Sequence, residues 1–172
     1  MGTRERQEAI RSQLRRLNNT VFYLNNPERL LIRVNKKLIE EGWIDEMIAE
    51  RFDSQGSSQG NPWAPLKVDT IRDRARKGFG PSPILVRTGS LLDKALSSTK
   101  KALAEGIEVK MRGDTTVADA LNDGTFTIPA RPFFGAPTAA EIEPLVRRRN
   151  QLINEALRRL ANGESLTGFL PS

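Results

Sequence analysis

The feature that most restricts the fold of this chain is a long segment with helical periodicity before its C-terminus. Apolar residues recur there three and four positions apart, the spacing that places them on one face of an α-helix. They are Ile142, Leu145, Val146, Leu152, Ile153, Ala156, Leu157 and Leu160. Thr138 and Glu141 have the spacing of a capping box, and Gly163 favours the left-handed conformation that ends a helix. The sequence therefore predicts a long amphipathic helix over residues 138–163.

Two further helices are predicted at the N-terminal end. The first has a narrow apolar stripe among arginines, which is typical of a helix that lies on a surface of its own domain or of a neighbour. The stripe consists of Ile10, Leu14, Leu17 and Val21. The second begins at Asn26 and Pro27, which suit the N-cap and the first helical position, and continues to Phe52. Gly42 inside it predicts a kink or a close helix crossing.

The next part of the chain is predicted to contain a loop and two short elements. Residues 54–66 are rich in serine, glycine, glutamine and proline, which indicates a long loop around Trp63. A short basic helix follows and ends at Gly78. After a turn, the run ILVR at residues 84–87 predicts a short strand.

A helix and a small sheet are predicted after that strand. Ser90 and Asp93 have the spacing of a capping box at the start of the helix. In the following segment Ile107, Val109 and Met111 alternate with charged residues, which predicts a strand of a β-hairpin. Residues 117–124 predict a short turn or helix, and TFTI at residues 125–128 predicts another strand.

Together these elements predict an α+β fold, in which several helices pack with a small, mostly antiparallel sheet and the first and last helices are long. A chain of 172 residues with 38% hydrophobic and 28% charged residues is most simply one domain, residues 1–172. We expect an N-terminal helical extension at 1–25, the long loop at 54–66 and a C-terminal tail at 163–172. Phe169 and Leu170 make this tail apolar, so we expect it to dock on its own domain or on a neighbour.

The composition excludes several kinds of chemistry. The chain has neither cysteine nor histidine, so disulfides, thiolate nucleophiles, Cys/His zinc sites and imidazole acid–base catalysis are ruled out. No pattern assembles a nucleophile, a base and an orienting group, and acidic pairs such as Glu40 and Glu41 are typical of a solvated helix face. We therefore expect no catalytic residues, no metal site and no cofactor, and we expect that the protein is not an enzyme.

Membrane insertion and secretion are not predicted either. No run approaches the ~20 apolar residues that span a bilayer. The first ten residues, MGTRERQEAI, lack the apolar stretch of a secretory leader. We expect a soluble, unprocessed protein with no membrane partner.

The charge of the chain favours an acidic partner. The formal net charge is +6, which suits nucleic acid or an acidic protein surface. The candidate contact residues, all in the short basic helix, are Arg72, Arg74, Arg76 and Lys77. Phe79 is the one aromatic residue beside them, so stacking on bases is poorly supported. The alternative is that these side chains form an ordinary solvated helix face.

Residues 128–135, IPARPFFG, lie directly before the long helix and cannot form a regular element; we call this segment the elbow. Pro129 and Pro132 fix their own φ angles and favour extended geometry in the residues that precede them. Phe133 and Phe134 would point to opposite faces of an extended chain. We expect one ring in the core and the other against a partner; the alternative places both rings in the core. The candidate interface residues are Trp63, Pro129, Arg131, Pro132, Phe133, Phe134, Phe169 and Leu170.

Three ordered motifs within residues 30–140 carry a family resemblance. The first is Arg51–Phe52 followed, after the long loop, by GNPWAPLKVDT at residues 60–70. The second is ILVRTGSLLDKAL at residues 84–96, and the third is the elbow. Together they resemble the bacteriophage virion morphogenesis or tail-completion proteins, including the Mu-type proteins. That family commonly has a tyrosine–alanine and a histidine before the third motif, where this chain has Val117 and Leu121.

The resemblance implies a structural protein of the phage neck, with no catalysis. It implies a ring of identical subunits, sixfold or twelvefold, that completes the tail or joins it to the head. The implied partners are sister copies, the adjacent portal or adaptor protein, and tail-terminator or tail-tube proteins, with non-specific contact to DNA. The implied location is the virion, after assembly in the cytoplasm of the bacterial host. The alternatives are a basic nucleic-acid-binding accessory protein and a minor capsid or tail assembly protein.

Overall fold

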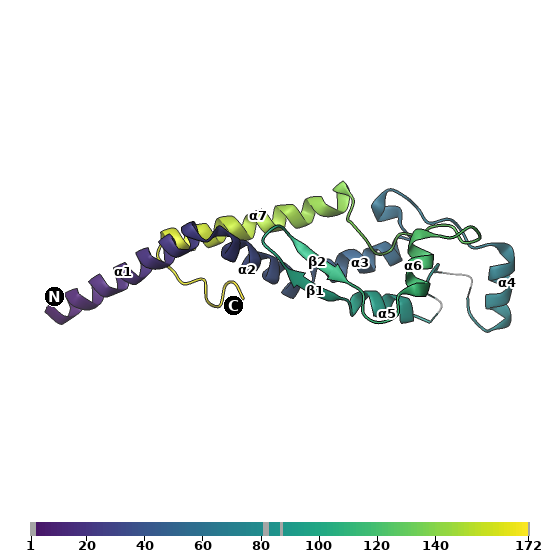
Figure 1. The fold of residues 1–172 in the computed structure, drawn as a ribbon, viewed down its shortest axis with the longest axis horizontal. Helices are drawn as coiled ribbons and strands as arrows, with labels where there is room; N and C mark the ends of the chain where they lie inside the picture. The colour runs from purple at the N-terminus through teal and green to yellow at the C-terminus, as the bar shows by residue number, and fades with distance from the viewer. Residues whose placement is uncertain (1–2, 81–82, 87, 172) are drawn as a thin grey trace. The chain divides into compact units, whose positions relative to one another are not determined.

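The computed structural model describes residues 3–80, 83–86 and 88–171. Within this part of the chain, the secondary structure consists of seven α-helices and one two-stranded sheet (Figure 1). The helices are α1 (Thr3–Asn25), α2 (Pro27–Glu40), α3 (Trp43–Asp53), α4 (Val68–Arg76), α5 (Ser90–Leu96), α6 (Thr116–Asp123) and α7 (Ala139–Ala161), with a 3-10 turn, η1, at Ser57–Gln59. The predicted α+β class with long first and last helices is confirmed.

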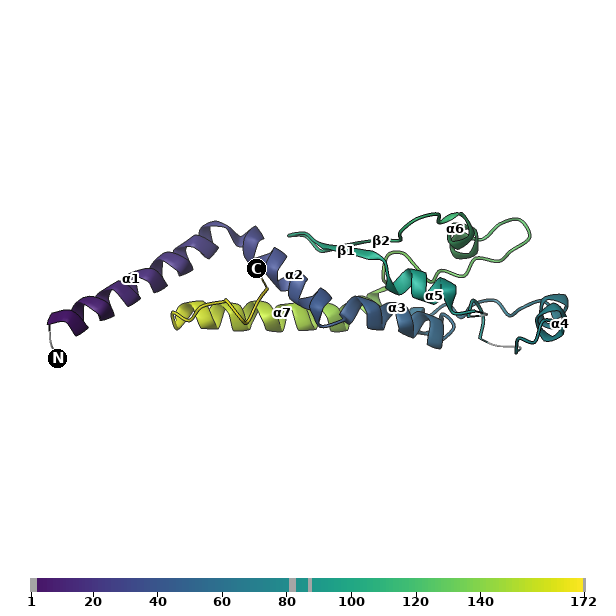
Figure 2. The same ribbon diagram turned by 90° about the horizontal axis from the view of Figure 1, so that it is seen from below.

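The sheet is the predicted hairpin of β1 (Thr99–Ala102) and β2 (Ile107–Lys110). A four-residue connection joins the strands, and a connection this short makes them antiparallel because parallel strands need a long crossover. The N–H of Leu103 donates to the carbonyl oxygen of Gly106 at 2.8 Å and closes the turn. Both views show the two strands side by side (Figures 1 and 2).

The chain divides into two compact units, each built from separate stretches of sequence. Unit 1 consists of Met1–Glu41, Lys101–Glu108 and Leu145–Ser172. Unit 2 consists of Gly42–Lys100 and Val109–Pro144. The hairpin and α7 therefore contribute residues to both units. Among the described helices, none combines the length and the apolarity that crossing a membrane requires.

Unit 1 is built on two helical faces that bury residues four positions apart. The buried residues are Leu30, Val34 and Leu38 on α2, and Leu152, Ala156 and Leu160 on α7. Asn35, also on α2, is a buried polar residue whose Nδ2 donates to the carbonyl oxygens of Leu103 at 2.7 Å and Gly106 at 3.2 Å. The side chain of Asn35 thus holds the hairpin turn against α2 and satisfies its own donors.

The C-terminal tail docks within unit 1. Leu166 and Leu170 are buried, and the guanidinium of Arg33 donates to the carbonyl oxygens of Leu170 and Pro171, both at 2.8 Å. The tail leaves α7 through Gly163, which has a φ of +72°. This docking agrees with the first of the two expectations for the tail, that it would pack on its own chain.

Unit 2 has its core on one face of α3, where Ile44, Ile48 and Phe52 are buried. Unit 2 also buries residues from α5, α6, the long loop and the elbow. They are Ala95, Ala118, Trp63 and Phe133. The elbow is therefore part of the core of unit 2 and ends at the start of α7.

Local signals at the ends of α7 form as predicted. The backbone N–H of Thr138 donates to the Glu141 carboxylate at 2.8 Å, and the N–H of Glu141 faces the Thr138 hydroxyl at 3.4 Å, which is a capping box. At the other end the N–H of Gly163 donates to Leu160 at 2.9 Å and that of Glu164 to Arg159 at 2.7 Å. This pair of bonds is the Schellman ending that a glycine permits.

The predicted helix from Asn26 to Phe52 is broken at Gly42. α2 ends at Glu40 and α3 begins at Trp43, because Gly42 has a left-handed φ of +81° that cannot continue a helix. A Cβ placed on Gly42 would have no heavy atom within 4 Å. Glycine is therefore needed here for the backbone conformation of the helix break. A close helix crossing at this position is excluded.

The strand predicted at residues 84–87 is wrong. Residues 84–86 form a turn, and Leu85 has a φ of +64°, which no strand residue adopts. The N–H of Ile84 donates to the side-chain oxygen of Gln55 at 2.6 Å in place of a sheet partner. Arg87 lies outside the described residues.

The strand predicted at residues 125–128 is also wrong. These residues bend, and the N–H of Thr125 donates to the carbonyl oxygen of Ile128 at 2.7 Å. The Phe126 ring is fully exposed at this bend. Residues 117–124 were predicted as a short turn or helix, and the structure has helix α6 at Thr116–Asp123.

The capping box predicted for Ser90 and Asp93 does not form. α5 begins at Ser90 itself, and its N-cap is Gly89, with a φ of +77°. The hydroxyl of Ser90 pairs instead with that of Thr88 at 2.9 Å. The helix is confirmed, but its start lies one residue away from the position that the capping pattern required.

Candidate interaction site

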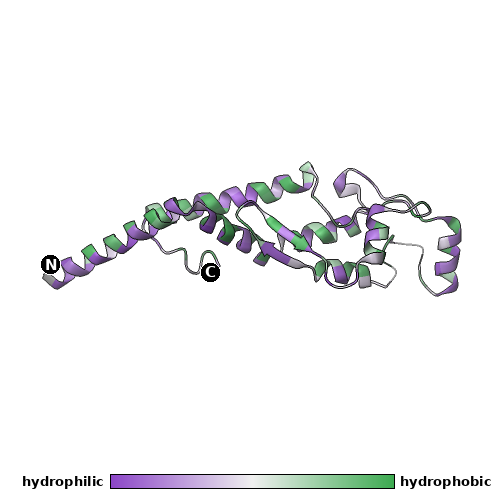
Figure 3. Cartoon of the chain, in the orientation of Figure 1, coloured by the Kyte–Doolittle hydropathy of each residue, from purple (hydrophilic) through white to green (hydrophobic). Residues whose placement is uncertain are grey.

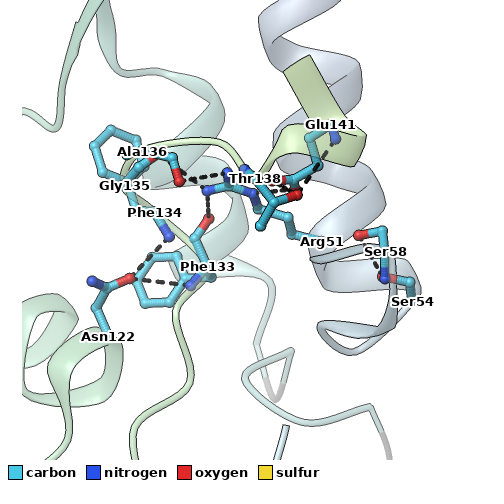
Figure 4. Close-up of polar contacts among 10 residues, drawn as sticks. All are labelled: Arg51, Ser54, Ser58, Asn122, Phe133, Phe134, Gly135, Ala136, Thr138 and Glu141. Atoms are coloured by element: carbon cyan, nitrogen blue, oxygen red, sulfur yellow. Dashed lines mark hydrogen bonds and ion pairs between the residues drawn. The ribbon is translucent and has the colours of Figure 1, made fainter. Parts of the chain in front are cut away.

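A buried ion pair joins α3 to the start of α7, and its arginine also contacts the elbow. The Arg51 side chain is 1% exposed and that of Glu141 6%. Arg51 Nε lies 2.7 Å from Glu141 Oε1 and Nη2 lies 3.0 Å from Oε2, so the contact is bidentate (Figure 4). Arg51 Nη1 also donates to the carbonyl oxygens of Phe133 and Gly135, each at 3.4 Å. One side chain of α3 thus fixes both the end of the elbow and the first turn of α7.

The ionisation of Glu141 is controlled by opposing effects. Burial disfavours the charged form and alone would raise the pKa of the Glu141 carboxyl. Hydrogen bonds from Arg51 and from the Thr138 backbone, together with the positive charge of Arg51, outweigh burial and hold this pKa below its ordinary value. Glu141 is therefore a carboxylate in the folded protein.

Acidification is expected to destabilise unit 2 through Glu141. Because the folded-state pKa lies below the ordinary value of about 4.5, ionisation of Glu141 stabilises the fold at every pH above that value. This contribution is lost as the pH falls through the folded pKa. Denaturant unfolding at about pH 7 and about pH 3 should show a larger loss of stability in the wild type than in Glu141→Gln. The same loss in both proteins would contradict the assignment.

Three aromatic rings pack next to this ion pair; we call Phe52, Trp63 and Phe133 the aromatic cluster. The ring centroids of Phe52 and Trp63 are 5.6 Å apart in a T-shaped arrangement, and those of Phe52 and Phe133 are 5.3 Å apart. All three side chains are buried. Gly56 allows the long loop to return to this cluster, because a Cβ there would lie 2.5 Å from the Trp63 ring.

The two phenylalanines of the elbow have different environments. Phe133 is 0% exposed, whereas Phe134 is half-buried. Asn122 at the end of α6 sets this arrangement, since its Oδ1 accepts from the backbone N–H groups of Phe133 at 3.1 Å and Phe134 at 2.9 Å (Figure 4). Phe133 therefore lies in the core, and Phe134 is the ring of this pair that retains solvent-exposed surface.

Replacing Asn122 with alanine should destabilise unit 2 by about 1–3 kcal/mol, because two backbone donors of the elbow lose their acceptor. Asn122→Asp keeps an acceptor oxygen at the same place and is the matched control. Thermal unfolding of the two variants provides the comparison. Equal melting temperatures for Asn122→Ala and the wild type would show that the two hydrogen bonds do not support the elbow.

Arg131 ties the elbow to the long loop. Its guanidinium donates to the carbonyl oxygen of Ala64, at 3.2 Å from Nε and 3.1 Å from Nη2. Burial lowers the pKa of Arg131, and the side chain is 5% exposed. Gly124 makes room for the elbow beside α6, because a Cβ there would lie 2.7 Å from the backbone nitrogen of Ala130. Its φ of +81° also favours glycine.

The contacts bring residues of all three sequence motifs into one assembly within unit 2. Arg51 and Phe52 of the first motif contact Phe133 of the third. Arg131 of the third motif contacts Ala64, which lies in the second part of the first motif. Ile84 of the second motif donates its N–H to the side chain of Gln55, which lies in the loop between the two parts of the first motif. We call this assembly the motif core.

The remaining candidate interface residues are spread over both units. Pro129 is exposed and Pro132 is half-buried, both in unit 2. In unit 1, Leu170 is buried and Phe169 is half-buried, with the Arg159 guanidinium 4.6 Å from its ring centroid. Four of the candidates are thus buried within their own units: Trp63, Arg131, Phe133 and Leu170. The surface left for a partner around the elbow comes from Phe134 and the two prolines.

The candidate basic contact residues are three arginines of α4 and Lys77 at its C-cap, and each of them already has a contact within the chain. Arg74 is 5% exposed and donates to the carbonyl oxygen of Pro83 at 3.3 Å, which is an internal contact. Lys77 lies 2.8 Å from an Asp73 oxygen. Arg72 lies 3.7 Å from Asp69, and Arg76 lies 4.0 Å from Asp73. Exposed pairs of this kind are weak, so they reduce the local positive charge without fixing the side chains.

Comparisons with known proteins identify no relative. The chain matches no protein-family model, no curated protein and no solved structure. Within the described ranges, no group of three or more acidic side chains is placed to hold a metal ion. A functional argument therefore depends on the motif core and on the exposed surfaces of the chain.

Proposed function

We propose that the chain is a structural subunit of the neck of a tailed bacteriophage. In this role it forms a ring with sister copies that completes the tail or joins it to the head. The observation that carries the proposal is the motif core, in which the first and third motifs contact each other and the second contacts the loop that joins the two parts of the first. Residues that contact one another in the folded protein constrain one another. Their contact therefore supports a fold shared with the resembled family more strongly than three unconnected motifs would.

The surface of unit 2 offers apolar side chains for assembly. Val117 is exposed on α6, Phe126 is fully exposed, and Phe134 is half-buried at the elbow. A ring needs two different surfaces that meet on neighbouring copies. The rigid elbow supports one such surface, because Arg51, Asn122 and the prolines fix its backbone before any partner binds and so reduce the entropy lost on binding.

Light scattering of the purified protein and mass spectrometry of phage particles test the proposal together. We expect a concentration-dependent multimer, and we expect the protein in mature particles of the phage or prophage that encodes it. A protein that stays monomeric at high concentration and is missing from mature particles would refute the neck role. A protein that multimerises but leaves before the particles mature would be an assembly factor instead.

Nucleic-acid binding is the second candidate function, favoured by the net charge of +6 and the exposed Arg72, Arg76 and Lys77. It predicts affinity for duplex DNA that falls by orders of magnitude between about 50 mM and about 200 mM salt. Replacing Arg72 and Arg76 with glutamine should then weaken binding uniformly across DNA sequences. Negligible binding in dilute salt would remove this candidate.

A further inference from the structure

The N-terminal helix α1 carries an apolar stripe that unit 1 leaves uncovered. The stripe comprises Ile10, Leu14, Leu17, Val21 and Leu24. Each of these side chains is between 52% and 63% exposed. Figure 3 shows apolar bands that recur along this helix between hydrophilic ones. A contiguous apolar surface of this kind is typical of a binding site.

Residues of α1 outside the stripe make the contacts within unit 1. The hydroxyl of Thr20 donates to the carbonyl oxygen of Leu160 on α7 at 3.0 Å. The Arg16 side chain lies directly beside Gly163, and the Tyr23 hydroxyl is hydrogen-bonded to Arg33. Since these contacts already fix α1 to its unit, the stripe is presented outward on an anchored helix.

The spacing of the stripe indicates that its partner is another helix. The five residues follow one another at intervals of four, three, four and three, which is the heptad pattern of a and d positions in a coiled coil. Gln13, Asn18 and Thr20 border the stripe and keep it narrow. A helix that lies on a membrane surface has a wider apolar face, so the pattern favours a single partner helix.

The charges that flank the stripe are all positive. In the heptad set by Leu14 as an a position, Arg4 and Arg11 occupy e positions and Arg6 a g position. The acidic residues of α1, Glu5 and Glu8, occupy f and b positions and lie away from the seam. Flanking e and g charges determine which helices pair.

We propose that the α1 stripe binds an acidic amphipathic helix of a partner protein, with apolar a and d residues and glutamate or aspartate at e and g. A second copy of α1 complements it poorly. A parallel copy would place Arg6 opposite Arg11, and an antiparallel copy would place Arg11 opposite Asn18, where no ion pair forms. The inference does not depend on the neck role, because an acidic helix of any partner protein complements the apolar stripe and its flanking arginines.

Two synthetic helices distinguish the partners. One peptide of about four heptads carries isoleucine at a, leucine at d and glutamate at e and g, and the other carries lysine at e and g. Each is labelled and titrated with the intact protein at low and high salt. We expect the glutamate peptide to bind at least about tenfold more tightly than the lysine peptide, and we expect salt to reduce this difference.

Variants of exposed residues then separate the stripe from its flanks. Leu14→Asn with Leu17→Asn should abolish binding of the glutamate peptide. Exchanging Arg4, Arg6 and Arg11 for glutamate should switch the preference to the lysine peptide. Arg15→Glu is the matched control at a b position and should leave the preference unchanged. Circular dichroism and the melting temperature verify that each variant is folded.

Three results would overturn the inference. Equal binding of both peptides, or binding of neither, would show that the flanking arginines do not select an acidic helix. Self-association that Leu14→Asn abolishes, without peptide binding, would assign the stripe to a second copy. Binding to anionic phospholipid vesicles without peptide binding would assign it to a membrane surface.

Discussion

Replacing Arg51 with alanine is expected to lower the free energy of unfolding of unit 2 by roughly 3–5 kcal/mol, the cost of breaking a buried ion pair. The variant leaves the Glu141 carboxylate buried without its cation. The carbonyl oxygens of Phe133 and Gly135 lose their donor as well. Both tryptophans of the chain, Trp43 and Trp63, lie in unit 2, so fluorescence-detected urea unfolding reports on this unit.

The control for Arg51 is another arginine with a carboxylate partner. Arg148 pairs with Glu41 at 2.6 Å in unit 1, but its side chain is 35% exposed, so Arg148→Ala should cost no more than about 1 kcal/mol. The double variant Arg51→Met with Glu141→Leu should recover much of the loss, because apolar residues remove both buried charges together. An Arg51→Ala variant as stable as Arg148→Ala would contradict the central place given to Arg51.

Phe133→Ala is expected to destabilise unit 2 by about 3–5 kcal/mol, since it removes a fully buried ring and leaves a cavity beside Phe52. The neighbouring variant Phe134→Ala is the matched control, because it deletes the same ring from a half-buried position. We expect it to cost about 1 kcal/mol. Thermal unfolding monitored by circular dichroism measures both.

The same two variants also bear on assembly. If Phe134 contributes to contacts between sister copies, Phe134→Ala should weaken multimer formation in light scattering while the melting temperature stays close to that of the wild type. A loss of stability in Phe134→Ala as large as in Phe133→Ala would place both rings in the core. That result would leave the elbow without an apolar contact for a partner.

Local sequence signals predicted both ends of α7. Thr138, Glu141 and Gly163 act within a few residues of their own positions, so the capping box and the Schellman ending follow from sequence alone. Strands depend on partners that local sequence does not contain. Residues 84–86 have the apolar character of a strand, but the side chain of Gln55 takes the Ile84 donor and the chain turns.

The candidate site was predictable only in part for the same reason. The prolines and the adjacent phenylalanines predicted the elbow, but they left open whether one ring or both lie in the core. The contacts that hold it join residues far apart, Arg51 with Glu141 and Ala64 with Arg131, and no spacing pattern indicates them. Asn122 stands in a short polar segment without any signal of its role. Trp63 was a candidate interface residue, but the loop returns at Gly56 and the Trp63 ring packs on Phe52.

The discontinuous composition of the two units has a consequence for biosynthesis. Unit 2 is contained within Gly42–Pro144, so its residues are all synthesised before those of Leu145–Ser172. Domains fold as their residues emerge during translation. Unit 1 includes Leu145–Ser172, so it is incomplete until these residues are made, and its apolar α2 residues Leu30, Val34 and Leu38 stay available to chaperones until then. A chain terminated before Leu145–Ser172 would therefore display this apolar face of α2 and be distinguishable from a complete chain by the folding machinery of the cell.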